Sequence, residues 1–216
     1  MQNILYLTEL FESIQGESRF SGRPSTFIRL SGCNLRCTWC DTSYSFKRGQ
    51  AFSLEAIIQQ TQAYTHPHVC VTGGEPLLQA PCNSLMKQLC QKGFIVSLET
   101  SGSLDIKPVD PRVHVILDVK CPGSGMEDKN KFENLKLIHE KDDIKFVLKD
   151  RSDYLFAKRI CHEYKLYDKT SQILLSPVFD ELNPQELIAW ILEDKLPFKL
   201  NLQIHKFIWH PNTQGV

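Results

Sequence analysis

The sequence has no run of about 18 apolar residues, the length that a membrane-spanning helix needs, and it has no block of like charges. Lysine plus arginine number 25 and aspartate plus glutamate number 25, so charge marks no surface for nucleic acid. The first residues carry Glu9 and Glu12, no basic stretch and no small-residue cleavage site, which argues against a signal peptide. A cytoplasmic location and a small-molecule partner are therefore expected.

Disulfide bonds are not expected either, although the chain has eight cysteines. Without an export signal, cysteines are normally kept as thiols in a reducing compartment. Five of them lie far apart along the chain: Cys70, Cys82, Cys90, Cys121 and Cys161. The other three, Cys33, Cys37 and Cys40, are crowded together, and only this crowding needs a chemical explanation.

Short apolar, β-branched runs alternate with segments of helical period. The expected strands cover residues 27–30, 68–72, 95–98, 113–119, 144–148, 173–175 and 202–208. The expected helices cover residues 53–64, 82–91, 152–164 and 184–192. Ser53 and Asn183 are suited to cap the first and the last of these helices, and Pro184 suits a first helical position.

This alternation predicts an α/β fold with a mostly parallel sheet and right-handed crossovers. A complete eight-fold barrel usually needs about 250 residues, and the chain has 216. We therefore expect a curved, partial (β/α) barrel that forms one domain over residues 1–216. Chemistry in such folds gathers where strands end, and TGGE at 72–75, ETSG at 99–102 and DVK at 118–120 stand at such ends.

The three crowded cysteines have the spacing C-x3-C-x2-C. A structural zinc site wants four nitrogen or sulfur ligands, commonly in two separated pairs, and no second pair is evident. Three thiolates can instead hold three irons of a [4Fe–4S] cube and leave the fourth iron open. Core cysteines, or a zinc site completed by His66 or His68, are the alternatives. Trp39 packs beside the cysteines and can limit the access of solvent to a cluster.

Glycines and polar side chains follow three of the predicted strands. Gly73 and Gly74 let the backbone approach a ligand closely, although a Gly-Gly pair alone is more often a turn. Ser101, Asp118 and Lys120 can project polar atoms into the mouth of the barrel. Their alternative role is that of ordinary caps and ion pairs on a solvated rim.

Polar groups before the cysteines suit a heterocyclic ligand. Gln15 and Glu17 flank a glycine in a loop, where an amide and a carboxylate can hydrogen-bond the edge of a ring. Arg29 lies on the strand that leads to the cysteines, and its guanidinium matches a carboxylate, or else forms a structural ion pair. His205 and Lys206, within the strand predicted at 202–208, can neutralise a substrate carboxylate or simply pack.

The segment CNLRCTWC at 33–40 resembles the cluster motif of radical S-adenosylmethionine enzymes. This resemblance implies a partial (β/α) barrel, a [4Fe–4S] cluster on Cys33, Cys37 and Cys40, and S-adenosylmethionine on the open iron, where the cofactors carry the hard chemistry. It also implies that Gly74 contacts the methionine amino group. The S-adenosylmethionine contacts expected with it are Trp39, Cys40, Asp41, Gly74, Ser101, Asp118, Val119, Lys120, Ser176, Pro177, Val178 and Phe179.

Further segments resemble a narrower family, the 7-carboxy-7-deazaguanine synthases of queuosine biosynthesis. They are ESIQGE, DTSY, TGGEP, ETSGS, DVKCPGSG, KFV and QIHKFIW. The resemblance implies a radical ring contraction of 6-carboxy-5,6,7,8-tetrahydropterin to 7-carboxy-7-deazaguanine with loss of ammonia. The implied substrate contacts are Ile14, Gln15, Gly16, Arg29, Thr72 and His205, and the implied Mg²⁺ ligand is Thr42.

The resemblance also implies a homodimer and an electron donor such as flavodoxin or ferredoxin. Two other classes remain as alternatives. A glycyl-radical-enzyme activase would need an open face for a partner protein and would have no use for Thr42. A non-catalytic zinc-binding module would be colourless, whereas an iron–sulfur protein purified without oxygen is brown.

Overall fold

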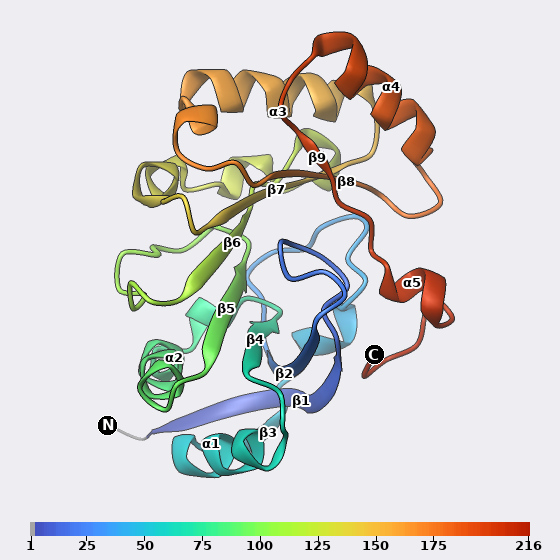
Figure 1. Ribbon diagram of the computed structural model, residues 1–216. Helices are drawn as coiled ribbons and strands as arrows, with labels where there is room; N and C mark the ends of the chain where they lie inside the picture. The colour runs from blue at the N-terminus through green and yellow to red at the C-terminus, as the bar shows by residue number, and fades with distance from the viewer. Residues whose placement is uncertain (1–2) are drawn as a thin grey trace.

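The computed structural model describes residues 3–216 and contains a nine-stranded sheet in the order β3-β1-β2-β4-β5-β6-β7-β8-β9. The strands are β1 (Ile4–Ile14), β2 (Pro24–Leu30), β3 (Gln50–Ser53), β4 (His68–Gly73), β5 (Ile95–Thr100), β6 (His114–Asp118), β7 (Asp143–Leu148), β8 (Ile173–Pro177) and β9 (Lys199–Leu200). All pairs from β2–β4 to β8–β9 are parallel, whereas β1 pairs antiparallel with β2 and β3. The sheet curves without closing, because β3 and β9 are its unpaired edges within the described residues (Figure 1). The predicted partial barrel is confirmed.

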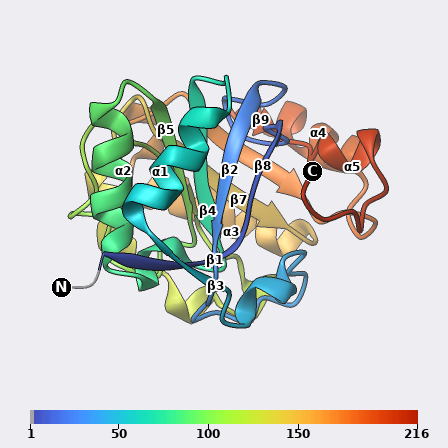
Figure 2. The ribbon, with the colours of Figure 1, turned by 90° about the horizontal axis from the view of Figure 1, so that it is seen from below.

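Four helices cover the outside of this curved sheet, and a fifth, short helix follows the last strand and contributes to the inner side of the sheet. They are α1 (Leu54–Ala63), α2 (Pro81–Gln91), α3 (Arg151–Glu163), α4 (Pro184–Asp194) and the single turn α5 (His205–Ile208). Six 3-10 turns accompany them: η1 (Ser43–Phe46), η2 (Pro76–Leu78), η3 (Pro122–Ser124), η4 (Glu127–Lys129), η5 (Phe132–Leu137) and η6 (Leu166–Asp168). Figure 1 shows α1 and α2 outside the first half of the sheet and α3 and α4 outside the second half. Figure 2, the view from below, shows the same placement of α1 and α2.

Local capping explains where the helices begin. The Ser53 hydroxyl accepts a hydrogen bond from the backbone N–H of Ala56 at 3.1 Å, and the Asn183 side chain accepts one from Gln185 at 2.9 Å. Each bond satisfies an N–H that the first helical turn leaves free, which is worth about 1 kcal/mol. Both predicted caps are confirmed, as are the four predicted helices.

Two apolar cores lie between the sheet and the helices. Ile57 of α1 and Leu85 of α2 are fully buried in the first core, and Phe146 of β7 and Leu187 of α4 are fully buried in the second. Burying one such side chain contributes about 1.5–3 kcal/mol. Because most apolar side chains are taken up on the outer face, the inner face can carry polar groups beside a smaller number of apolar ones.

The strand predicted at 202–208 is wrong. The last strand, β9, ends at Leu200, and residues 205–208 form the single helical turn α5. The backbone N–H of Ile204 instead donates to the carbonyl of Gly16 at 3.0 Å, which draws the chain out of the sheet. Phe207 and Ile208 are 66% and 55% exposed, so their apolar character does not mark a buried strand; short apolar runs do not separate strand from helix.

The sequence analysis also missed β1 and β3, which extend the sheet at the edge next to β2. The other six predicted strands are confirmed, with ends that shift by up to three residues. Across residues 3–216, no helix combines the length and the apolar character that crossing a membrane requires.

Candidate active site

A cavity of about 800 Å³ opens on the inner face of the sheet, at the carboxyl ends of the parallel strands. Every site residue predicted from the sequence lines this cavity except Val119. The Val119 side chain is 3% exposed and packs in the second core, and its backbone N–H donates to the carbonyl of Lys145 at 2.8 Å. Val119 therefore does not line the cavity. Its neighbours Asp118 and Lys120 do line it at the end of this strand.

The three crowded cysteines are free, partly buried thiols at the cavity wall. Burial raises the pKa of each thiol, and a bound iron would lower it again by favouring the thiolate. Within residues 3–216, no three His, Cys, Asp or Glu side chains converge on a point where one metal ion would sit. A lone zinc needs such convergence, whereas a cube takes each thiolate on a different iron. The donor set thus fits a [4Fe–4S] cluster.

A second loop holds the cysteine loop in place. The backbone N–H of Thr38 donates to the carbonyl of Ser124 at 3.1 Å, and the Thr38 hydroxyl donates to the carbonyl of Gly123 at 2.9 Å. Gly123 is itself fixed, because its N–H donates to the buried Asp153 carboxylate at 2.8 Å. The loop that follows β6 therefore buttresses the segment between the second and third cysteines.

The two glycines after β4 cross directly against the cysteine loop. Gly73 has a φ of 148°, which favours glycine. The N–H of Gly74 donates to the carbonyl of Leu30 at 3.1 Å, and a β-carbon at residue 74 would lie 2.7 Å from the β-carbon of Cys33. Only glycine fits there, so a ligand on the cluster would meet bare backbone at Gly74.

Glu75 joins the ends of β4 and β5 from beneath the cavity. Its carboxylate is fully buried and accepts hydrogen bonds from the Thr100 hydroxyl at 2.9 Å, the Ser101 N–H at 2.8 Å and the Ser101 hydroxyl at 2.6 Å. Charged acceptors make the stronger class of hydrogen bond. Glu75 does not line the cavity, and its effect there is to hold Ser101 in position.

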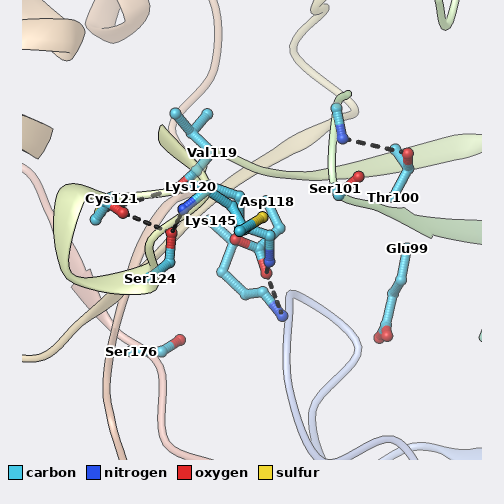
Figure 3. Close-up of polar contacts among 12 residues, drawn as sticks. Glu99, Thr100, Ser101, Asp118, Val119, Lys120, Cys121, Ser124, Lys145 and Ser176 are labelled. Atoms are coloured by element: carbon cyan, nitrogen blue, oxygen red, sulfur yellow. Dashed lines mark hydrogen bonds and ion pairs between the residues drawn. The ribbon is translucent and has the colours of Figure 1, made fainter. Parts of the chain in front are cut away.

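Two lysines and two carboxylates meet beside the end of β6, and Figure 3 shows three of these side chains, Asp118, Lys120 and Lys145. Asp118 pairs with Lys120 at 2.9 Å and with Lys145 at 3.6 Å, and Lys145 pairs with Glu17 at 2.9 Å. Burial alone would lower the pKa of Lys145, but Glu17 and Asp118 outweigh it and raise that pKa well above its usual value. One oxygen of Asp118, Oδ1, is buried and has no hydrogen-bond partner within the described residues. It is an acceptor left for a ligand.

Sequence reasoning did not select Lys145 or Glu99 as site residues. Lys145 interrupts the otherwise apolar run at 144–148, which was a usable signal. The Glu99 carboxylate accepts hydrogen bonds from the Gln15 amide at 3.2 Å and from the Thr72 hydroxyl at 3.0 Å. Two predicted substrate contacts therefore meet on one carboxylate at the end of β5, where Figure 3 shows it.

The segment just after the cysteines carries a strongly acidic group. Burial alone would raise the pKa of Asp41, but Lys206 and the hydrogen bonds from Thr42 and Gln203 outweigh it, and the pKa falls to about 2. The Thr42 hydroxyl donates to Asp41 at 2.8 Å. Asp41 is therefore ionised at neutral pH. Its carboxylate and the Thr42 hydroxyl lie next to each other at the cavity wall.

A curved, open (β/α) barrel with a C-x3-C-x2-C loop at the carboxyl ends of its strands defines the radical S-adenosylmethionine class of enzymes. The model of the Radical SAM superfamily matches residues 27–118. This stretch runs from β2 through the cysteine loop and the two glycines to the end of β6, so it contains the three cysteines of the cavity wall.

Relatives define the family within that class. A 7-carboxy-7-deazaguanine synthase of Chlorobaculum tepidum is 43% identical over 98% of this chain and 97% of its own length, and one of Koribacter versatilis is 41% identical over 98% and 100%. The crystal structure of QueE from Escherichia coli matches with a TM-score of 0.72 at 26% identity, covering 92% of this chain and 93% of that one. The chain belongs to the 7-carboxy-7-deazaguanine synthase family.

Proposed function

We propose that this chain converts 6-carboxy-5,6,7,8-tetrahydropterin to 7-carboxy-7-deazaguanine, a ring contraction that releases ammonia and feeds queuosine or other 7-deazapurine biosynthesis. The observation that carries the proposal is that one cavity joins the three cysteines, the polar loop at 14–17 and Arg29. The names of the relatives at 41–43% identity support the same reaction. We also propose that residues 1–216 act as one domain.

The [4Fe–4S] cluster and S-adenosylmethionine, when bound, supply the radical that removes a hydrogen atom from the substrate. The chain's own part is to bind and orient. Cys33, Cys37 and Cys40 would hold the irons. The other residues that we assign to S-adenosylmethionine are Trp39, Asp41, Gly74, Ser101, Asp118, Lys120, Ser176, Pro177, Val178 and Phe179, all of which line the cavity.

The pterin ring needs acceptors for its amino and ring N–H groups. Gln15, Glu17 and Glu99 supply amide and carboxylate oxygens at one side of the cavity. Arg29 would bind the carboxylate of the substrate. Burial lowers the pKa of His205, so its ring is neutral at pH 7 and offers that carboxylate a hydrogen bond rather than a charge. Ile14, Gly16 and Thr72 complete the proposed substrate contacts.

Mg²⁺ is part of the proposal, with Thr42 as a ligand. Magnesium takes oxygen ligands, keeps several waters and is often held by few protein groups plus the substrate. The Thr42 hydroxyl lines the cavity and already donates to Asp41, which leaves its oxygen lone pairs for a cation. The ionised Asp41 beside it adds the negative charge that favours a cation there.

A homodimer and an electron donor such as flavodoxin or ferredoxin complete the proposal. The exposed Phe207 and Ile208 of α5 offer an apolar surface for a subunit contact. All eight cysteines are free thiols, which supports a reducing compartment such as the cytoplasm.

The test is product formation. The chain is purified without oxygen, loaded with iron and sulfide, and incubated with reductant, S-adenosylmethionine, Mg²⁺ and 6-carboxytetrahydropterin, beside a Cys37→Ala control. Mass spectrometry should detect 7-carboxy-7-deazaguanine only with the wild type. Cleavage of S-adenosylmethionine without deazaguanine would leave the radical class intact and overturn the proposed substrate. Absence of a cluster would overturn both.

A further inference from the structure

A β-bulge in β1 decides which side chain faces Arg29. Leu7 lies opposite Leu30 of β2, but the next pair in register is Glu9 with Arg29, so β1 holds one extra residue here. The apolar side chains change phase with it, because Leu7 packs in the first core and the next residue to pack against that core is Leu10. Bulges often re-aim a side chain beside an active site, and this one turns Glu9 to the inner face.

The bulge depends on a glycine outside the cavity. A β-carbon at Gly49 would lie 2.9 Å from the backbone nitrogen of Thr8 and would overlap the carbonyl of Leu7. The Thr8 hydroxyl is buried and has no hydrogen-bond partner in the described part of the chain, which is a local cost. The bulge is thus present although it leaves the buried Thr8 hydroxyl without a hydrogen-bond partner among the described residues. A local cost of this kind is typical of a feature with a role in function.

Glu9 fixes Arg29 through a short, charge-assisted bond. Its Oε1 atom accepts from Arg29 Nε at 2.6 Å and from the Tyr44 hydroxyl at 2.8 Å. The side chains of Arg29 and Glu9 are only 15% and 20% exposed, so solvent screens the pair weakly. The guanidinium also lies 5.9 Å from the centroid of the Phe11 ring.

The rest of the guanidinium is left for a ligand. Residues 3–216 give Nε of Arg29 a hydrogen-bond partner but give none to its two Nη groups, and Arg29 lines the cavity. The Tyr44 hydroxyl donates to the same Glu9 oxygen that accepts from Arg29, at 2.8 Å. Tyr44 therefore holds Glu9 in the orientation that engages Nε.

We propose that Glu9 is a positioning residue, which with Tyr44 sets the plane of the Arg29 guanidinium so that its Nη groups bind a carboxylate of the substrate. Carboxylate recognition by arginine needs this planar alignment. The inference rests on the proposed function, in which the substrate carries a carboxylate on its pterin ring.

The test compares two oxidised pterins that differ in one group, 6-carboxypterin and 6-hydroxymethylpterin. Their dissociation constants are measured by calorimetry on the cluster-loaded enzyme with S-adenosylmethionine and Mg²⁺ but without reductant. Glu9→Leu should weaken 6-carboxypterin by about 10- to 100-fold, the worth of a charge-assisted bond, and 6-hydroxymethylpterin by less than about threefold. Glu9→Gln, which keeps an acceptor for Nε, should recover part of the loss.

Glu12→Leu is the matched control, since Glu12 lies on the same strand and pairs instead with His66. Tyr44→Phe provides a second variant if Glu9→Leu does not fold. It should lower the affinity for 6-carboxypterin relative to that for 6-hydroxymethylpterin by about two- to fivefold. The role of Glu9 would be overturned if its variants weakened the binding of both pterins equally. It would also be overturned if the Glu9 and Tyr44 variants kept the wild-type preference for 6-carboxypterin over 6-hydroxymethylpterin while Arg29→Met lowered that preference. If the wild type and the Arg29→Met variant each bound the two pterins with equal affinity, the proposed substrate would instead be overturned.

Discussion

The imidazole of His205 packs directly against the backbone of Gly16, and a β-carbon at residue 16 would lie 2.9 Å from the Cγ atom of that ring. The neighbouring N–H of Ile204 donates to the Gly16 carbonyl at 3.0 Å. The β1–β2 loop and the segment before α5 thus fit together with no room for a side chain at residue 16.

Gly16→Ala is therefore expected to displace His205 while leaving the fold intact. The KM for the pterin should rise about tenfold, equivalent to about 1.4 kcal/mol, with a smaller change in kcat. Steady-state kinetics checks this. In a His205→Ala background the imidazole ring is absent, so adding Gly16→Ala should change the KM for the pterin little. A further rise in KM as large as the one that Gly16→Ala causes in the wild type would show that the glycine acts in another way.

Glu75→Gln should destabilise the chain and weaken the binding of S-adenosylmethionine. An amide in place of the carboxylate directs N–H hydrogens at the Ser101 donors, and a buried polar group left unsatisfied costs about 1–3 kcal/mol. Urea unfolding measures the stability, and calorimetry measures the cofactor. The exposed Glu55→Gln change is the control, and a Glu75→Gln protein as stable as this control would contradict the prediction.

Lys145→Met should be more harmful than Lys145→Arg. Methionine leaves the partly buried carboxylates of Glu17 and Asp118 without the buried ammonium that joins them, and the cost should approach the roughly 3–5 kcal/mol of breaking a fully buried pair. Arginine keeps the charge and should retain part of the activity. Urea unfolding and turnover of the pterin check both variants against Lys136→Met on the surface; equal behaviour of the methionine and arginine variants would rule out a role for the charge.

Acid should destabilise the fold through His68. This ring is fully buried, contacts the hydroxyls of Ser25 at 2.6 Å and Ser97 at 3.0 Å, and its burial, with Arg23 and His114 nearby, lowers its pKa to about 4. The unfolded chain has the higher pKa, about 6.5, and so binds more protons between the two values.

The contribution of His68 is therefore complete above pH 6.5 and decreases as the pH falls toward 4, by up to about 3 kcal/mol. Urea unfolding between pH 7 and 4.5 should show a shallower loss for His68→Gln than for the wild type, with the exposed His139→Gln as the control. Identical slopes in all three proteins would contradict this assignment.

Thr42→Val should raise the Mg²⁺ concentration needed for half-maximal turnover, because valine keeps the shape and removes the oxygen ligand. Thr42→Ser keeps the hydroxyl and should stay near the wild type. The loss of one oxygen ligand is expected to cost about tenfold in Mg²⁺ affinity. A Mg²⁺ titration of product formation measures it, and a Thr42→Val enzyme with the wild-type titration curve would exclude Thr42 as a ligand.

Sequence patterns predicted most of this fold because its signals are local. The caps at Ser53 and Asn183, the alternation of strands and helices, and the spacing of Cys33, Cys37 and Cys40 all lie within short windows. Nearly all of the predicted site residues line the cavity, since the carboxyl ends of parallel strands meet at one edge.

What escaped prediction depends on distant segments. Glu9 faces Arg29 only because of a bulge that Gly49 accommodates, and no local pattern signals a register shift. Glu99 becomes part of the site through Gln15 and Thr72, which lie on other elements. The segment at 202–208 leaves the sheet because Gly16 offers its carbonyl, a contact between parts of the chain that are far apart in sequence.

The pairing of the β1–β2 loop with the segment before α5 also orders events during translation. The cysteine loop leaves the ribosome early, but the residues that complete its cavity, including Gln203 and His205, leave it last. Contacts of such long sequence separation form slowly. A nascent chain would therefore expose its cysteines fully to solvent before the cavity exists, whereas in the folded chain they are partly buried and are reached through the cavity.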